Sequence, residues 1–196
     1  DEMSREDLIL LDSVAHVVLK DKLPDLQHVK DLDIPKPATD KAYRAVETAT
    51  SGNELAETNE NLRFYNGYGG FAVNSNEYVV TISSNPDTGI LEFPPAPWIN
   101  VITNPQFGFL TTEKGSSYTW SRNSRENKLT PWSNDAVTDP SGEAIYLREE
   151  KEQLFWSPLP QPVPGSAFYE VRHGHGYSTY RSQTLNINQK LTTWVD

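Results

Sequence analysis

One strongly polar, glycine-free run has residue types suited to binding chemistry: Ser117 to Asp135, with the sequence SYTWSRNSRENKLTPWSND. It combines two tryptophans with asparagine, arginine and acidic side chains. Flat aromatic faces can cover the apolar C–H patches of a sugar ring while polar side chains satisfy its hydroxyls, each of which costs about 1 to 3 kcal/mol if buried without a partner. The run is therefore a candidate sugar-binding loop. The residues expected to contact or enclose the sugar are Trp120, Arg125, Glu126, Asn127, Trp132, Asn134 and Asp135, with Trp120 as a stacking candidate.

The same composition also fits a loop that only packs well on a β-protein. In that interpretation the tryptophans belong to the core, the asparagines shape turns, and Arg125 and Glu126 pair with neighbouring residues to hold the loop. Residue types alone leave both interpretations open.

Other spacings are weaker signals. His173 and His175 would project from one face of a strand and could hold a metal ion, but no carboxylate or third imidazole is close in sequence, so we expect no metal and a structural hydrogen bond from His173. Glu126 and Asp135 could form a glycosidase pair, one acid and one base. The NGYGG segment (66–70) lacks the lysine and the helix of a phosphate-binding loop, so we expect a tight turn.

The composition of the chain limits the classes of partner that it can bind. The net charge of −10 makes a nucleic acid or an anionic membrane surface a poor partner, and no apolar run approaches the roughly 20 residues that a membrane span requires. The chain has no cysteine, so disulfides are excluded, and a cytoplasmic location is compatible with this. We expect no cofactor, no nucleic acid and no direct membrane contact.

The elements that would position the loop change character near residue 61. Residues 1–60 hold 14 acidic against 7 basic residues, and apolar residues 11, 14, 15 and 18 follow Ser4 at helical spacing. A second helix is expected from Thr39 towards Gly52, with an extended, proline-containing connection between the two. We therefore divide the chain into an acidic helical arm or linker (1–61) and a β-sandwich domain (62–196). The acidic arm is either a solvated face or a segment that docks on another domain.

Short runs rich in β-branched and aromatic residues, separated by turn signals, follow from Leu62. They predict a mainly β chain, folded as an antiparallel β-sandwich. The expected strands are Tyr78–Ser83, Ile99–Thr103, Gly108–Thr112, Ser117–Ser121, Ala144–Arg148, Phe168–His173, Tyr177–Ser182 and Leu191–Val195.

Several long motifs occur in one order from about Leu62 to the last residue. They are FYNGYGGF (64–71), EYVV (77–80), PAPWINVITNPQFGF (95–109), YTWSRNSRENKLTPWSND (118–135), GEAIYLRE (142–149), FWSPLPQP (155–162) and VRHGHGYSTY (171–180). In these motifs the chain resembles the family of cyclic β-1,2-glucan synthases and β-glucan phosphorylases, which includes cellobiose and chitobiose phosphorylases and was formerly glycosyltransferase family thirty-six. Residues 1–61 carry no motif of that family.

The resemblance implies a supersandwich-like domain that precedes linker helices and an (α/α)6 barrel, and it places the general acid in that barrel. We therefore expect this chain to be a segment of a longer polypeptide, and we name no catalytic residue in it. The resemblance also implies homodimers in which a loop of the sandwich closes over a neighbouring active site. The implied partners are a β-glucan oligosaccharide, closest to the β-1,2-glucan branch, and the barrel domain.

Three functions remain open from the sequence. The first is a non-catalytic sandwich that helps to shape the active site of a phosphorylase or glucan synthase. The second is an independent carbohydrate-binding module, which exposed and coplanar Trp120 and Trp132 would favour. The third is a structural or dimerising domain, which an exposed apolar patch without convergent polar groups would favour.

Overall fold

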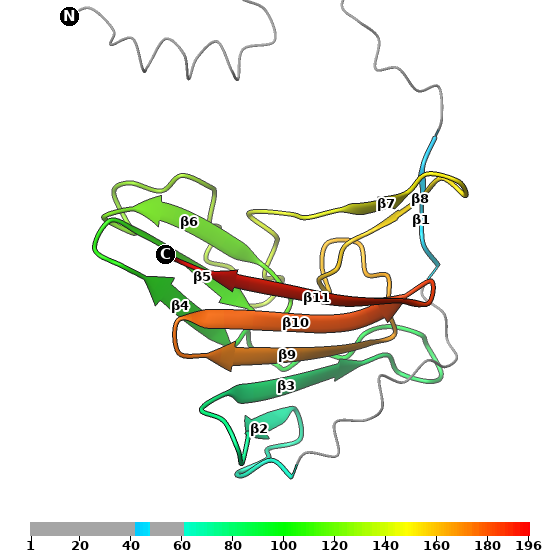
Figure 1. The fold of residues 1–196 in the computed structure, drawn as a ribbon, viewed down its shortest axis with the longest axis horizontal. Coiled ribbons are helices and arrows are strands. Elements are labelled where there is room, and N and C mark those ends of the chain that lie inside the picture. Colours follow the sequence, from blue (N-terminus) through cyan, green and yellow to red (C-terminus); the bar gives the residue numbers. More distant parts are fainter. Residues whose placement is uncertain (1–41, 48–60) are drawn as a thin grey trace, which may run out of the picture. The chain divides into compact units, whose positions relative to one another are not determined.

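The structure is a computed structural model that describes residues 42–47 and 61–196. In these ranges the chain forms eleven β-strands in three sheets (Figure 1), and none of its elements is a helix long and apolar enough to cross a membrane. The strands are β1 (Arg44–Ala45), β2 (Gly69–Phe71), β3 (Tyr78–Ser83), β4 (Ile99–Thr103), β5 (Phe107–Thr112), β6 (Ser117–Ser121), β7 (Leu147–Glu149), β8 (Leu154–Trp156), β9 (Phe168–Gly174), β10 (Tyr177–Thr184) and β11 (Ile187–Trp194).

The largest sheet has the order β11-β10-β9-β3-β2, with every neighbouring pair antiparallel (Figure 1). Leu185 and Asn186 join β10 to β11 with φ angles of 49° and 63°. Two successive positive φ angles are what a two-residue hairpin of type I′ requires, because this turn matches the twist of the strands. The turn thereby sets the pairing of Thr184 with Ile187 and of every later pair in the hairpin.

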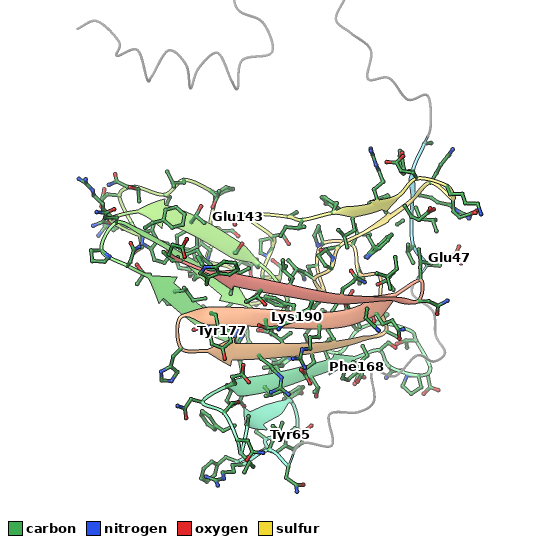
Figure 2. All side chains as sticks on the ribbon, viewed as in Figure 1. Glu47, Tyr65, Glu143, Phe168, Tyr177 and Lys190 are labelled. Atoms are coloured by element: carbon green, nitrogen blue, oxygen red, sulfur yellow. The ribbon has the colours of Figure 1, made fainter. Side chains whose placement is uncertain are left out.

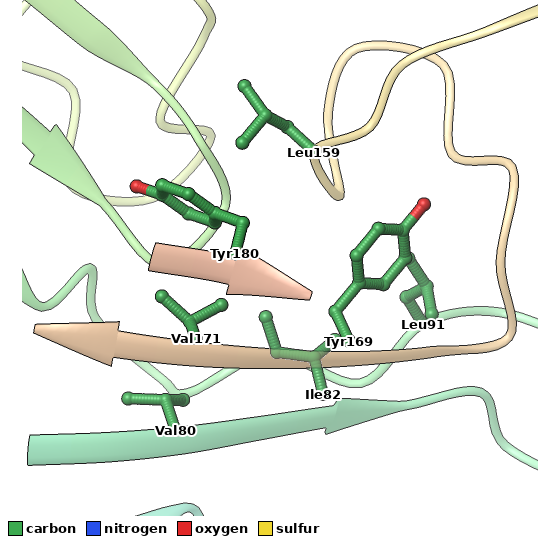
Figure 3. Packing of buried hydrophobic residues seen from close by; sticks show 7 residues of the cluster. All are labelled: Val80, Ile82, Leu91, Leu159, Tyr169, Val171 and Tyr180. Atoms are coloured by element: carbon green, nitrogen blue, oxygen red, sulfur yellow. The ribbon is translucent and has the colours of Figure 1, made fainter. Parts of the chain in front are cut away.

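One face of this sheet carries the hydrophobic core. Val80 and Ile82 of β3 lie beside Val171 and Tyr169 of β9, and Tyr180 of β10 lies beside Val171 (Figure 3). These five side chains are at most 1% exposed, and each buried aliphatic side chain contributes about 1.5 to 3 kcal/mol. The period of two along each strand places them all on one face. Leu91 and Leu159 complete the cluster from connecting segments.

A second, three-stranded sheet has the order β4-β5-β6 and is also antiparallel. In its register Val101, Leu110 and Tyr118 lie side by side, so they share one face, which we call the outer face. Thr111 lies on the opposite, inner face, where its hydroxyl is 2.6 Å from the Tyr180 hydroxyl of the large sheet. Tyr180 also donates a hydrogen bond of 2.7 Å to the Thr112 carbonyl, so this buried phenol connects the two sheets.

Two titratable side chains with little exposure, Glu113 and His173, make hydrogen bonds within the fold. The backbone N–H of Trp98 donates to the Glu113 carboxylate at 2.7 Å, and Glu113 is fully buried. His173 of β9 is partly buried, and its Nδ1 lies 2.9 Å from the Ser178 hydroxyl. The structural hydrogen bond expected for His173 is therefore present.

Most of the predicted strands are confirmed, and so is the mainly β, antiparallel fold. The bounds of β3, β4 and β6 agree with the sequence prediction, and those of β5, β9 and β10 differ by one or two residues. β7 begins three residues later than predicted, and β11 begins four residues earlier because its polar start lies at an exposed sheet edge. β1, β2 and β8 have only two or three residues each, too short for a periodic signal.

The second predicted helix is wrong where the structure describes it. Residues 44 and 45 form β1, which runs parallel to β8. Arg44 N–H donates to the Gln153 carbonyl and Val46 N–H to the Phe155 carbonyl, both at 3.0 Å. These pairings override the local helix propensity. The first predicted helix lies outside the described residues, and the domain boundary at residue 61 stays a prediction.

Glu113 makes the stability of the fold depend on pH. Burial raises the pKa of its carboxyl from 4.5 to about 7, and the hydrogen bond from Trp98 offsets only part of this. The stability that comes from the bound proton is complete below pH 4.5 and is lost as the pH rises through about 7. We expect Glu113→Gln to be more stable than the unmodified chain above neutral pH by up to about 3 kcal/mol, with the difference shrinking towards acid pH.

Urea unfolding of both proteins at about pH 5 and about pH 8 measures this difference. Glu126→Gln is the matched control, because the Glu126 side chain is 69% exposed. Parallel stability curves for Glu113→Gln and the unmodified chain would contradict the assignment.

His173 makes the stability of the fold depend on pH in the acid range. Burial lowers the pKa of its imidazole from 6.5 to about 4. Between these pH values the imidazole binds a proton in the unfolded chain but not in the folded chain. Stability is therefore lost as the pH falls from 6.5 towards 4. We expect His173→Gln to flatten the fall in melting temperature over this range, whereas the exposed His175→Gln leaves the fall unchanged. Equal slopes for the two variants would refute this cause.

Candidate functional site

The candidate sugar-binding run continues from β6 into a long connection, residues 122–139, which we call the 122–139 loop. Its first half folds back along β6: Ser121 N–H donates to the Asn127 carbonyl at 3.0 Å, and Leu129 N–H donates to the Thr119 carbonyl at 2.9 Å. A bridge between Trp120 and Lys128 continues this pairing. Residues 127–129 therefore pair along the edge of β6 with a defined register, and the loop then brings Trp132 onto Tyr118 of the outer face.

The loop buries an aromatic cluster on that outer face. Leu110, Tyr118 and Trp120 form it, with exposed fractions of 7%, 4% and 6%. The Trp120 ring lies over Gly108, where a Cβ would come within 2.6 Å of it. A glycine is needed there because only a residue without a side chain leaves room for the indole. Trp120, expected to stack on sugar, thus has no open ring face and packs as a core residue.

Trp132 has a different environment. It is 38% exposed, and its ring stacks on Tyr118 with a centroid distance of 4.9 Å and an interplanar angle of 13°. The Lys128 ammonium lies 5.6 Å from the same indole centroid, within range of a cation–π interaction. A buried Tyr118 therefore supports a surface indole from below. Neither Tyr118 nor Lys128 was among the sequence candidates, although both lie in the same motif.

The tip of the loop is shaped by Asn123. Its side-chain oxygen accepts hydrogen bonds from the backbone of Arg125 and of Glu126, both at 2.9 Å, and its carbonyl accepts from Asn127 N–H at 3.0 Å. The side chains of Arg125 and Glu126 pair with each other at 3.2 Å, 89% and 69% exposed. An ion pair this exposed contributes little stability. Both polar side chains are therefore directed to solvent at the tip of the loop.

Asp135 organises the second half of the loop. Its carboxylate accepts from the backbone of Val137 at 2.9 Å and of Thr138 at 3.1 Å, and from the Thr138 hydroxyl at 2.7 Å. The Thr138 hydroxyl hydrogen bond is the largest cause that lowers the pKa of Asp135. A general acid needs a raised pKa, so this environment is unsuited to that half of a glycosidase pair. Asn134 precedes it with a φ of 52° and is exposed.

Two polar contacts tie the loop to the sheet. The Thr130 hydroxyl accepts from Thr119 N–H at 2.8 Å and donates to Glu143 at 2.6 Å, and the Ser117 hydroxyl donates to the other Glu143 oxygen at 2.9 Å. Figure 2 labels Glu143 on the connection between β6 and β7. Sequence reasoning missed Thr130 and Glu143, because no sequence pattern indicates that these two residues, 13 positions apart, meet.

The structure thus places six of the seven candidates in the 122–139 loop and Trp120 on the adjoining strand β6, and it separates their roles. Trp132, Arg125, Glu126, Asn127 and Asn134 lie at its surface. Trp120 supports the loop from the core, and Asp135 shapes a turn. Within residues 42–47 and 61–196, no three histidine, aspartate or glutamate side chains come close enough to hold a metal ion.

Comparison with known proteins identifies the family to which the chain belongs. Residues 76–196 match the family described as "Glycosyl hydrolase 94, supersandwich domain". The chain is 45% identical over 122 residues to the cyclic beta-(1,2)-glucan synthase NdvB of Rhizobium meliloti (strain 1021), covering 62% of this chain and 4% of that protein. It is 34% identical over 131 residues to the N,N'-diacetylchitobiose phosphorylase of Vibrio furnissii and 30% identical over 131 residues to that of Vibrio proteolyticus, covering 65% of this chain and 15% of each relative.

The chain therefore spans only a small part of the relatives that it matches. The match begins just before β3 and includes the core of the large sheet, the β4-β5-β6 sheet and the whole 122–139 loop. The β-strands, the aromatic loop and these matches together identify the chain as a member of the glycosyl hydrolase 94 family that contains its supersandwich domain.

Proposed function

We propose that this domain is a non-catalytic, carbohydrate-associated part of a β-glucan phosphorylase or glucan synthase, and that its 122–139 loop contacts the saccharide. The observation that carries the proposal is Trp132, a surface indole stacked on the buried Tyr118 ring at 4.9 Å. Stacking of this kind holds the indole in place, so a sugar ring can pack on it without a large loss of side-chain freedom once the Lys128 ammonium, 5.6 Å from the indole centroid, moves aside.

The polar side chains of the loop complement the indole. Arg125, Glu126, Asn127 and Asn134 supply charged donors, carboxylate oxygens and amides that are open to solvent. A saccharide has both apolar C–H faces and hydroxyls, and this surface offers partners for both. The hydrogen bonds of 2.9 Å that the side chains of Asn123 and Asp135 accept from the backbone support a loop with a fixed shape.

The carboxyl groups support a positioning role rather than a catalytic one. Glu113 has the raised pKa that a general acid needs, but it is fully buried and reaches no substrate. Asp135 has a lowered pKa and is engaged by the Thr138 turn. We propose that the acid lies in a barrel domain of the parent protein. The loop would then help to orient the saccharide and exclude water, which a phosphorylase needs because water competes with phosphate.

Within this proposal the saccharide is a β-1,2-linked glucan. The 45% identity to the cyclic beta-(1,2)-glucan synthase, against 34% and 30% to the two chitobiose phosphorylases, supports this choice of linkage. The proposed partners of the domain are this oligosaccharide, the barrel domain and a second copy in a homodimer.

Isothermal titration of the chain with β-1,2-linked gluco-oligosaccharides tests the proposal, with cellobiose and N,N'-diacetylchitobiose as comparisons. We expect saturable binding of the β-1,2-linked ligand that Trp132→Ala weakens about tenfold or more, which corresponds to about 1.4 kcal/mol. Phe64→Ala is the matched control, since Phe64 is also an exposed aromatic, at 85%, and lies outside the loop. Binding that survives Trp132→Ala, or no binding at millimolar ligand, would contradict the loop assignment.

The exposed part of the outer face supports a second function, dimerisation or domain contact. Ile99 and Val101 of β4 are 51% and 57% exposed, and the register places Val101 beside Leu110. Alternating apolar residues on an edge strand form a surface suited to another protein. We expect Val101→Lys to raise the dissociation constant of any dimer at least tenfold in sedimentation equilibrium, because it buries a charge in the contact. A monomer, or a dimer unaffected by the lysine, would argue against this function.

A further inference from the structure

The first part of the 122–139 loop is a hairpin that continues β6. Ser121 N–H donates to the Asn127 carbonyl at 3.0 Å, and an antiparallel bridge places Lys128 opposite Trp120. Opposed residues of an antiparallel pair project from the same face. Lys128 therefore begins beside the outer face of the β4-β5-β6 sheet, at a position that the backbone pairing sets.

Two side chains flank the Trp132 indole. Tyr118 stacks on the ring at a centroid distance of 4.9 Å and an interplanar angle of 13°, while the Lys128 ammonium lies over the ring, 5.6 Å from its centroid. Trp132 is 38% exposed. A ligand that stacks on the exposed part of the indole therefore meets an ammonium group.

The hairpin that carries Lys128 is basic, although the chain has a net charge of −10. Residues 122–128 hold three basic side chains, Arg122, Arg125 and Lys128, against one acid, Glu126. All four are exposed, and Glu126 forms an ion pair with Arg125 at 3.2 Å. Arg122 and Lys128 form no ion pair with any residue in the described ranges. Two positive charges of the hairpin are thus available to a ligand.

We propose that Lys128 makes the Trp132 surface selective for a sugar ring that carries an anionic group, with a phosphate monoester as the preferred case. The inference rests on the proposed function, because it takes Trp132 as the stacking surface for a saccharide. It adds the charge of the ligand and the residue that selects it.

The selectivity follows from what each ligand does to the ammonium. A neutral sugar that stacks on Trp132 displaces Lys128 from the ring, so the cation–π contact is lost and no charge replaces it. An anionic group draws the ammonium to itself and forms a charge-assisted hydrogen bond, which is stronger than a bond between neutral groups. The anionic sugar therefore recovers the energy that the neutral sugar loses.

A phosphate monoester suits this surface better than a carboxylate. It carries a charge of about −1.5 to −2 at pH 7 and three acceptor oxygens. Lys128 offers three donors, and the guanidinium of Arg122 offers a planar fork that matches phosphate oxygens. Two sources share this chemistry: a glucan with a phosphate substituent, and a free sugar phosphate.

NMR titration of the whole ¹⁵N-labelled chain tests the proposal through the indole N–H signal of Trp132, which Trp132→Ala identifies. The ligands are glucose, glucose 6-phosphate, glucose 1-phosphate and inorganic phosphate. We expect at least one sugar phosphate to bind about tenfold or more tightly than glucose. The advantage should largely disappear when NaCl is raised from about 50 to about 500 mM, because exposed charges are screened. Tighter binding of the 6-phosphate indicates a substituted glucan, and tighter binding of the 1-phosphate indicates a free sugar phosphate; both support the proposal.

The variant Lys128→Met removes the ammonium and keeps an unbranched apolar side chain. We expect it to reduce the ratio of the two affinities, sugar phosphate over glucose, about tenfold, whereas Lys128→Arg keeps most of the ratio. Lys151→Met is the matched control, because Lys151 is exposed in the turn between β7 and β8, outside the loop. A purely structural role of Lys128 would weaken both ligands equally and leave the ratio unchanged.

Three results overturn the proposal. They are equal affinities for glucose and its phosphates, a ratio that Lys128→Met leaves unchanged, and a shift of the Trp132 signal by inorganic phosphate as large as that by the sugar phosphates. The first two leave the proposed function intact if the neutral β-1,2-linked oligosaccharide still binds at Trp132. Absence of all saccharide binding, neutral and anionic, instead contradicts the proposed function itself and this inference with it.

Discussion

A buried phenol holds the small sheet on the large one, together with Asn100 of β4, whose side-chain amide donates to the Gly174 and Tyr177 carbonyls at 3.0 and 2.9 Å. Tyr180 is 1% exposed, belongs to the core of the large sheet, and reaches Thr111 and Thr112 of the small sheet through its hydroxyl. A hydroxyl buried without a partner costs about 1 to 3 kcal/mol, so the small sheet must stay where its carbonyl meets Tyr180. Because β5 and β6 carry the aromatic cluster on which the 122–139 loop packs, the candidate site depends on this contact.

In the 122–139 loop and the adjoining strand, the residues that pack on the sheet differ from those that we propose for recognition. Trp120 and Tyr118 are buried and hold the loop on the sheet, while Trp132 is supported by Tyr118 and remains partly exposed. The same division applies to its polar residues: Asp135 is engaged by the backbone, whereas Arg125 points into solvent. A loop that must present a surface to a ligand needs such an internal frame, since ordering a flexible loop on binding would cost affinity.

Much of the fold could be predicted from local pattern. The strands with clear alternation or turn signals, such as β3, β4 and β6, have their predicted bounds, and the motifs of the loop indicated the family that the comparisons confirm. The failures are at β1, where Arg44 and Ala45 favour a helix but pair with β8, and at the start of β11, where an edge strand is polar. At β1 the deciding hydrogen bonds come from residues far away in the sequence, whereas the start of β11 is decided by the two-residue turn that pairs Ile187 with Thr184.

The sequence by itself determined the chemistry available: which loop is rich in aromatic and polar residues, which segments alternate, and which family the chain resembles. Only the tertiary structure decided which tryptophan is open to a ligand, because Trp120 and Trp132 have the same chemistry and differ in what covers them. It also decided that Glu113 is a buried acid with a raised pKa and that the Thr130 hydroxyl donates to Glu143. Exposure, desolvation and long-range contact are properties of the packed chain, so they cannot be derived from the order of the residues alone.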